Sequence, residues 1–260
     1  MKFRGPLLLG SVLVTGCALW GPGQREMEAA QRHIVLGDAL YANGSFSDSI
    51  LHYQRSLEFV GDQPLVEVRL GRAYARLDKL ELAEKTIRSA CLKASPFPEC
   101  YLELAILLDR RKNFLGALEA SSQAAQVLTF PRLDEALRQQ AYATANLGRF
   151  SESQQLINRA LKINPNSCWN KVAKAWIEIE SKSFDQPESF LRQARESCAS
   201  QSLFYEWEAW GLLKVGRRSD AKQVYNRILG SFRNPAVQER ARLNIEKIEN
   251  RISIDRPELF

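Results

Sequence analysis

The chain has 260 residues, 45% of them hydrophobic, and its 36 lysines and arginines against 30 aspartates and glutamates give a formal net charge of +6. Positive and negative side chains are mixed along the chain without a basic block, which argues against a dedicated nucleic-acid-binding protein. The sequence has no glycine-rich phosphate loop, no nucleophile elbow and no histidine with suitably spaced Cys or Ser partners. We therefore expect neither an enzyme nor a cofactor.

The first 16 residues have the pattern of an export signal. Lys2 and Arg4 precede the apolar run 6–14, which is too short for a stable membrane span. We expect residues 1–16 to be removed. Loss of Lys2 and Arg4 then lowers the net charge from +6 to +4.

The signal ends in Val14-Thr15-Gly16-Cys17, which resembles the lipobox of bacterial lipoproteins. The resemblance implies that Cys17 becomes the acylated N-terminus, and several acyl chains hold a protein stably on a bilayer. Ala18, where that family's sorting pattern avoids Asp, implies the periplasmic face of the bacterial outer membrane. Residues 17–29 are then a lipid anchor and a flexible tether. The alternative is an ordinary secretory signal with an incidental cysteine.

From about residue 30 the sequence repeats with a period of 34. Leu36-Gly37 is followed by Leu70-Gly71 and Leu104-Ala105 at that spacing. The pattern resembles the tetratricopeptide repeat, a pair of amphipathic helices that buries its apolar face by stacking on its neighbours. We predict an all-α tetratricopeptide repeat superhelix over residues 30–251. Its six helix-turn-helix repeats start near residues 30, 64, 98, 134, 168 and 202, followed by a capping helix at about 236–251 and a loosely held tail at 252–260.

Four cysteines remain after Cys17, and an even number in an exported chain favours disulfides, although four cysteines allow three pairings. In the repeat geometry, Cys91 and Cys100 flank one turn between helices, whereas Cys168 and Cys198 lie at adjoining ends of one antiparallel pair. We therefore predict the disulfides Cys91–Cys100 and Cys168–Cys198. A metal site is the alternative, and it is disfavoured because no Cys-x-x-Cys pair occurs and both histidines lie far from the cysteines.

The step from the third repeat to the fourth is 36 residues. Segment 124–131, Ala-Ala-Gln-Val-Leu-Thr-Phe-Pro, resembles the interrupted junction of the PilF/PilW/Tgl family of type IV pilus pilotins. The lipobox and the six repeats extend this resemblance over nearly the whole chain. Pro187, inside repeat 5, departs from the family pattern and predicts a kink or a short second helix.

The ninth position of each repeat points into a concave groove in tetratricopeptide proteins. Here that position changes from polar to aromatic along the chain, and neighbouring groove positions are mostly apolar. The predicted partner-binding groove consists of Ile34, Leu65, Val68, Arg72, Leu102, Ile106, Tyr142, Trp169, Val172, Trp176 and Trp210. Such a lining favours an amphipathic helix of a protein partner. The alternative is that the tryptophans pack between helices.

The resemblance implies a pilotin that binds secretin protomers through such a helix and promotes secretin oligomerisation and outer-membrane assembly for type IV pili. The alternative is a lipoprotein scaffold for cell-wall hydrolases or other envelope complexes. Arg69, Arg72 and Arg76 share one face of the first helix of repeat 2. This face is either a solvated surface or a contact for an acidic partner.

Overall fold

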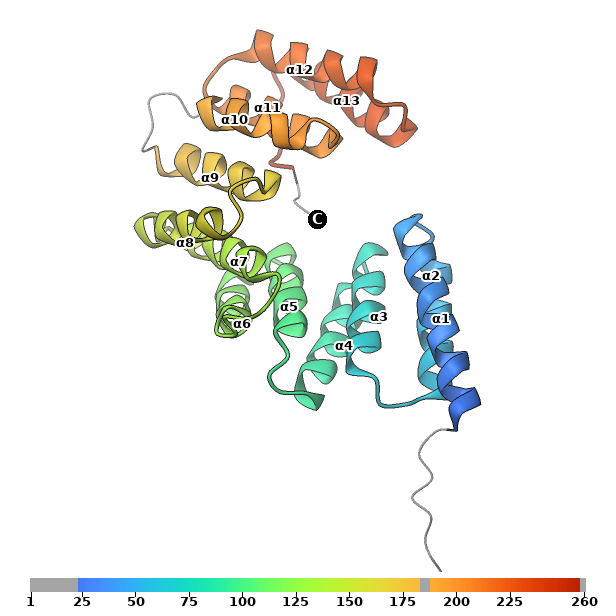
Figure 1. The fold of residues 1–260 in the computed structure, drawn as a ribbon. Coiled ribbons are helices and arrows are strands. Elements are labelled where there is room, and N and C mark those ends of the chain that lie inside the picture. The colour runs from blue at the N-terminus through green and yellow to red at the C-terminus, as the bar shows by residue number, and fades with distance from the viewer. Residues whose placement is uncertain (1–22, 183–187, 258–260) are drawn as a thin grey trace, which may run out of the picture.

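The computed structural model describes residues 23–182 and 188–257, and within these ranges the chain forms helices and no strand. The helices are α1 (Gln24–Ala42), α2 (Phe46–Phe59), α3 (Pro64–Arg76), α4 (Leu80–Lys93), α5 (Pro98–Arg110), α6 (Phe114–Ala125), α7 (Leu133–Asn146), α8 (Phe150–Ile163), α9 (Cys168–Ser181), α10 (Glu188–Cys198), α11 (Ser202–Lys214), α12 (Arg218–Ser231) and α13 (Pro235–Glu249). Figure 1 shows them stacked in pairs that wind around a hollow. The all-α repeat prediction is thus confirmed.

The odd-numbered helices form the inner surface of this superhelix. From α3 to α11, each odd-numbered helix contacts the next odd-numbered one as well as its own even-numbered partner. We call the surface of α1, α3, α5, α7, α9 and α11 the hollow face. It is the surface that the sequence predicts to bind a partner.

Close packing inside each pair depends on small residues of the inner helices. A Cβ atom added to Gly71 would lie 2.4 Å from Cγ1 of Ile87, and one added to Gly37 would lie 2.7 Å from Cε1 of Tyr53. Both distances are far inside van der Waals contact, so only glycine lets the outer helix approach this closely. The pairs Leu36-Gly37 and Leu70-Gly71 therefore mark points of close helix contact.

The turn within each repeat places one residue in the left-handed region at the same position of all six repeats. Three of these residues are glycines and three carry side chains; they are Gly44, Asp78, Lys112, Gly148, Lys182 and Gly216, with φ between 52° and 82°. Such a residue ends the inner helix and turns the chain toward the outer one. The repeat is thus defined by backbone geometry even where its sequence diverges.

The hydrophobic core has two large parts, which we call half-cores. The first lies mainly in α2–α6, and the second extends from α7 to α13. A small cluster of Leu102, Ala124, Phe130 and Ala136 lies where they meet. Phe130, only 4% exposed, comes from the predicted junction between α6 and α7. The residues inserted at the junction therefore supply a buried side chain between the half-cores.

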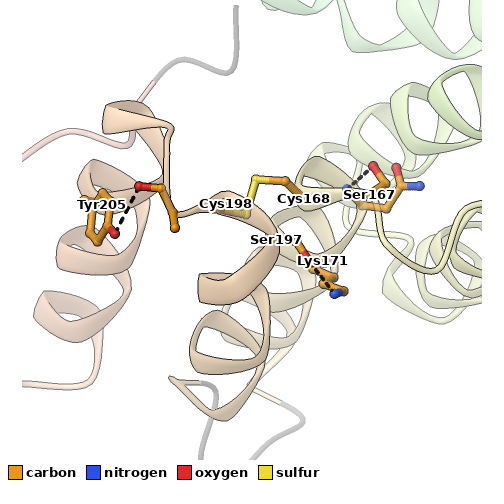
Figure 2. The surroundings of a disulfide bond; sticks show 8 residues. Ser167, Cys168, Lys171, Ser197, Cys198 and Tyr205 are labelled. Carbon is orange, nitrogen blue, oxygen red and sulfur yellow. Dashed lines mark hydrogen bonds between the residues drawn. A yellow bond between two sulfur atoms is a disulfide. The ribbon is translucent and has the colours of Figure 1, made fainter.

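Both predicted disulfides are present. Cys91 is bonded to Cys100 across the turn between α4 and α5, with Cα atoms 5.5 Å apart. Cys168 and Cys198 join the start of α9 to the end of α10, with Cα atoms 5.2 Å apart (Figure 2). Beside this second bond, Nζ of Lys171 donates a 2.7 Å hydrogen bond to Oγ of Ser197, a second link between the same helices.

Several predicted boundaries differ from the structure. Helix α1 begins at Gln24, so residues 24–29 are helical and the tether is shorter than predicted. Strong helix formers such as Gln, Glu and Arg fill this turn, and the Glu26 carboxylate accepts the Gly23 amide at 2.9 Å. The predicted cap corresponds to α13, and α10, with 11 residues, is the shortest of the described helices. Cys17 and Pro187 lie outside the described residues.

Candidate partner-binding surface

The hollow face carries a cavity of about 280 Å³ between α1 and α9. Its charged lining has five arginines and two glutamates, which we call the arginine basin: Arg72, Arg76, Arg110, Arg132 and Arg138 with Glu103 and Glu135. Ile106, Leu107 and Trp169 add apolar surface. The basin is therefore amphipathic, with an excess of positive charge.

Glu103 holds two arginines from different elements at the centre of the basin. Its carboxylate pairs with Nε of Arg72 at 3.3 Å and with Nη1 of Arg132 at 3.0 Å. The Glu103 side chain is only 8% exposed, so water screens these contacts less than it screens pairs on the surface. The contacts fix the junction residue Arg132 against α5, whose Glu103 also holds Arg72 of α3.

Glu135 repeats this arrangement one turn into α7. Its Oε2 lies 2.9 Å from Nη2 of Arg132 and 3.6 Å from Nη2 of Arg138. Burial raises the pKa of the Glu135 carboxyl, but the hydrogen bond and charge of Arg132, together with the charges of Arg138 and Arg72, bring the pKa below its ordinary value. Glu135 is thus an anion at neutral pH and orients the guanidinium groups around it.

Aromatic rings support the other edge of the basin. The guanidinium of Arg72 lies 5.2 Å from the ring centre of Tyr41, and that of Arg76 lies 4.9 Å from the ring centre of Phe46. Both are within the range of cation–π attraction. Nη2 of Arg110 pairs with Asp78 at 3.0 Å. The cations are therefore held in fixed directions.

The groove residues Trp176 and Trp210 line a second cavity on the hollow face, but their side chains are almost fully buried. Trp176 and Trp210 are each 2% exposed, and Tyr142 is 1% exposed. Trp176 packs against Tyr142 with ring centres 5.1 Å apart, and Trp210 packs against Trp207 at 5.6 Å. These three aromatic side chains thus pack mainly within the helix stack, which corrects the prediction that they form an open apolar groove.

The remaining groove residues divide into three groups. Val68, Leu102 and Val172 are buried in the core, which contradicts their prediction as binding residues. Arg72, Ile106 and Trp169 do line the basin. Ile34 is partly buried and Leu65 is 46% exposed, and neither lines the basin.

Sequence reasoning had singled out Arg72 and Arg76 but missed the other charged residues of the basin. Arg110 lies one 34-residue period after Arg76, so a search for charge at equal repeat positions would have added it. Arg132 lies in the junction and has no equivalent in the other repeats. Its role emerges only from the contacts with Glu103 and Glu135.

Two histidines meet away from the basin. Nδ1 of His33 on α1 and Nδ1 of His52 on α2 are 2.8 Å apart, and Phe59 stacks on His33. Within residues 23–182 and 188–257, no group of three or more His, Cys, Asp or Glu side chains could hold a metal ion. In the same ranges, no helix combines the length and the apolar character that crossing a bilayer requires.

No family model matches this sequence, and no curated protein matches it. Solved structures do share its fold. The structure of Pseudomonas aeruginosa PilF covers 85% of this chain and all of its own, with 12% identity and a TM-score of 0.64. PilW, described as a widely conserved type IV pilus biogenesis factor, covers 81% of this chain and 97% of its own, with 13% identity and a TM-score of 0.67.

A third similar structure is that of the tetratricopeptide protein TTC0263 from Thermus thermophilus. It covers 71% of this chain and all of its own, with 20% identity and a TM-score of 0.62. Identities this low establish the architecture alone. The chain therefore has the tetratricopeptide repeat fold, with the arginine basin on its hollow face.

Proposed function

We propose that this protein is a lipid-anchored, non-catalytic assembly factor that binds secretin protomers and promotes their oligomerisation in the outer membrane for type IV pili. The arginine basin is the observation that carries the proposal of a protein partner, since a rigid, partly apolar and cationic cavity fits a peptide surface. The lipobox at Cys17 supports attachment to the periplasmic face of the outer membrane. PilF and PilW, whose structures share the fold of this chain, are pilus proteins, and this supports the proposed role in pilus assembly.

The partner's chemistry follows from the lining. An amphipathic helix would place apolar side chains on Ile106 and Trp169 and acidic side chains beside the five arginines. This gives charged contacts a larger share than in the mostly apolar groove predicted from the sequence. Arg76 is exposed and faces the cavity, which makes it the best single site for reversing the charge.

The test is capture of secretin from detergent-solubilised envelopes by the lipidated protein and by its variant Arg76→Glu/Ile106→Ser. We expect the variant to capture roughly tenfold less secretin and to leave fewer heat-resistant multimers in cells, because both the charge and the apolar contact are lost. Arg159→Glu, an exposed arginine on α8, is the matched control. Normal secretin multimers in a deletion strain with altered peptidoglycan would overturn the proposal and favour a scaffold for cell-wall hydrolases.

A further inference from the structure

The chain reverses direction after α13 and returns across the hollow face. Arg251 has φ of 58°, and the amide of Ile252 donates a 2.8 Å hydrogen bond to the carbonyl oxygen of Lys247. This helix end directs the following segment, residues 252–257, into the hollow (Figure 1). Within the predicted tail, Ile254 and Arg256 contact the inner part of the helix stack.

The segment uses alternate side chains to contact the helices. Ile254 and Arg256 are partly buried, whereas Ser253 and Asp255 are exposed. Ile254 packs against the second half-core. The guanidinium of Arg256 lies 4.7 Å from the ring centre of Trp176, and its Nη1 lies 3.5 Å from Oδ1 of Asn146. Such alternation is how an extended peptide lies on a surface.

The site under Arg256 suits a guanidinium. We call Asp109, Asn146 and Trp176 the arginine seat. They come from α5, α7 and α9, so the seat spans three inner helices. Burial raises the pKa of the Asp109 carboxyl to about 6, and the charge of Arg256 opposes this rise. An aromatic face, an amide oxygen and a carboxylate together select a planar cation over an ammonium ion.

The segment leaves much of this surface uncovered. A cavity of about 510 Å³ lies between residues 253–256 and the inner helices. A longer or better-fitting peptide could therefore gain contacts that residues 252–257 do not make.

We propose that the arginine seat is a binding site for an extended segment of a protein partner that carries an arginine two residues after an aliphatic residue, and that residues 252–257 occupy this site within the same molecule. The inference rests on the proposed function only in using the hollow face as a binding surface. A tethered segment acts at high effective concentration, so it competes with any partner for the seat.

The test uses the full chain with its segment released by Ile254→Ser/Arg256→Ala, and a fluorescein-labelled peptide of sequence Asn-Arg-Ile-Ser-Ile-Asp-Arg-Pro, residues 250–257. We expect saturable binding to the released variant, measured by fluorescence anisotropy, and roughly tenfold or more weaker binding to the wild type. Binding should be lost when Ala replaces the peptide's second arginine or when the released variant also carries Asp109→Asn. Arg242→Ala, whose side chain is 61% exposed, is the control and should behave as the wild type.

An unchanged circular dichroism spectrum establishes that the released variant is folded. A folded released variant that does not bind the peptide, or that binds the Ala peptide equally well, overturns the proposal and leaves residues 252–257 as an internal strap. A separate readout is the Asp109 pKa by NMR, which should rise in Arg256→Ala because a neighbouring positive charge is removed. Failure of secretin capture would leave these results intact, so the two proposals are tested separately.

Discussion

Glycine has two different roles in this chain, and in each role its replacement by alanine should lower the stability for a different reason. At Gly71 the limit is space, because a Cβ would overlap Ile87 on the outer helix. At Gly148 there is open space around the position, but φ is 78°, which disfavours any side chain. The Leu70-Gly71 pair of the sequence pattern marks Gly71 without giving the steric cause.

We predict that Gly71→Ala and Gly148→Ala both destabilise the protein. Overpacking at Gly71 should cost about 1–3 kcal/mol, partly offset by the higher helix propensity of Ala, about 1 kcal/mol. Backbone strain at Gly148 should cost about 1–2 kcal/mol. Gly61→Ala, which has open space and an ordinary φ, is the control and should change the free energy of unfolding by less than about 0.5 kcal/mol. Urea denaturation measures all three, and equal stability of the Gly71 and Gly61 variants would contradict the steric explanation.

The paired histidines predict a pH dependence of stability. Burial and the nearby charges of His52, Arg55 and Arg32 lower the pKa of His33 below its ordinary 6.5, and Glu58 opposes them only in part. The unfolded chain therefore binds more protons than the folded chain around and below pH 6.5, so this group makes stability fall as the pH falls through that range.

Thermal denaturation between pH 7.5 and 5 should show this loss as a difference between the wild type and His33→Gln. The difference between the two curves removes the contribution of Asp109, whose raised pKa acts in the opposite direction. Parallel curves for the two proteins would show that the His33–His52 contact carries no proton linkage.

At the scale of helices, the sequence predicted the helix starts well where the turns repeat. It predicted the course of the chain poorly where no repeated turn precedes or follows a helix. Pro64 and Pro98 open α3 and α5 at the expected repeat starts. The start of α1 was missed because no preceding repeat supplies a turn at Gln24. The direction of residues 252–257 was missed because it depends on a left-handed conformation at Arg251, a residue type that gives no such signal.

The two disulfides should differ in their contribution to stability. In the chain-entropy model, closing loops with sequence separations of 9 and 30 residues stabilises by about 2.6 and about 3.7 kcal/mol, respectively. We expect Cys168→Ala/Cys198→Ala to lower the free energy of unfolding more than Cys91→Ala/Cys100→Ala does. Urea denaturation of the two variants tests the order, with the reduced wild type as the reference for losing both bonds. The reverse order would mean that local packing outweighs loop length.

At the scale of the whole molecule, packing at the junction determines whether the two half-cores unfold cooperatively. Stability in repeat arrays is a sum of nearest-neighbour interfaces, and Phe130 fills the interface between the two halves. The pilotin resemblance identified the junction from segment 124–131, but the burial of Phe130 follows from the fold alone.

We predict that Phe130→Ala costs about 3–5 kcal/mol and separates the unfolding of the two halves. Four of the five tryptophans lie in α9 and α11, so tryptophan fluorescence follows mainly the C-terminal half, whereas circular dichroism follows all helices. The two transitions should coincide in the wild type more closely than in the variant. Leu128→Ala, in the same connection but 75% exposed, is the control. Coincident transitions in both variants would contradict a linking role for Phe130.

The fold class, the repeat register and the cysteine pairing could be predicted from the sequence because each follows from the 34-residue period. The candidate binding surface could be predicted only in part, because the period gives a residue's position on a helix without giving the distance between neighbouring inner helices. That distance is short enough to bury Trp176 and Trp210. The cationic lining includes Arg132, which lies outside the periodic pattern.

Each half-core contains one complete disulfide, and neither bond crosses the junction. A chain that enters an oxidising compartment N-terminus first can therefore form Cys91–Cys100 before Cys168 and Cys198 have emerged. Each thiol then meets its native partner within its own half, so oxidation in order of emergence yields the correct pairs without isomerisation. The two disulfides of such a chain can thus form one after the other as it enters the compartment, first in the N-terminal half and then in the C-terminal half.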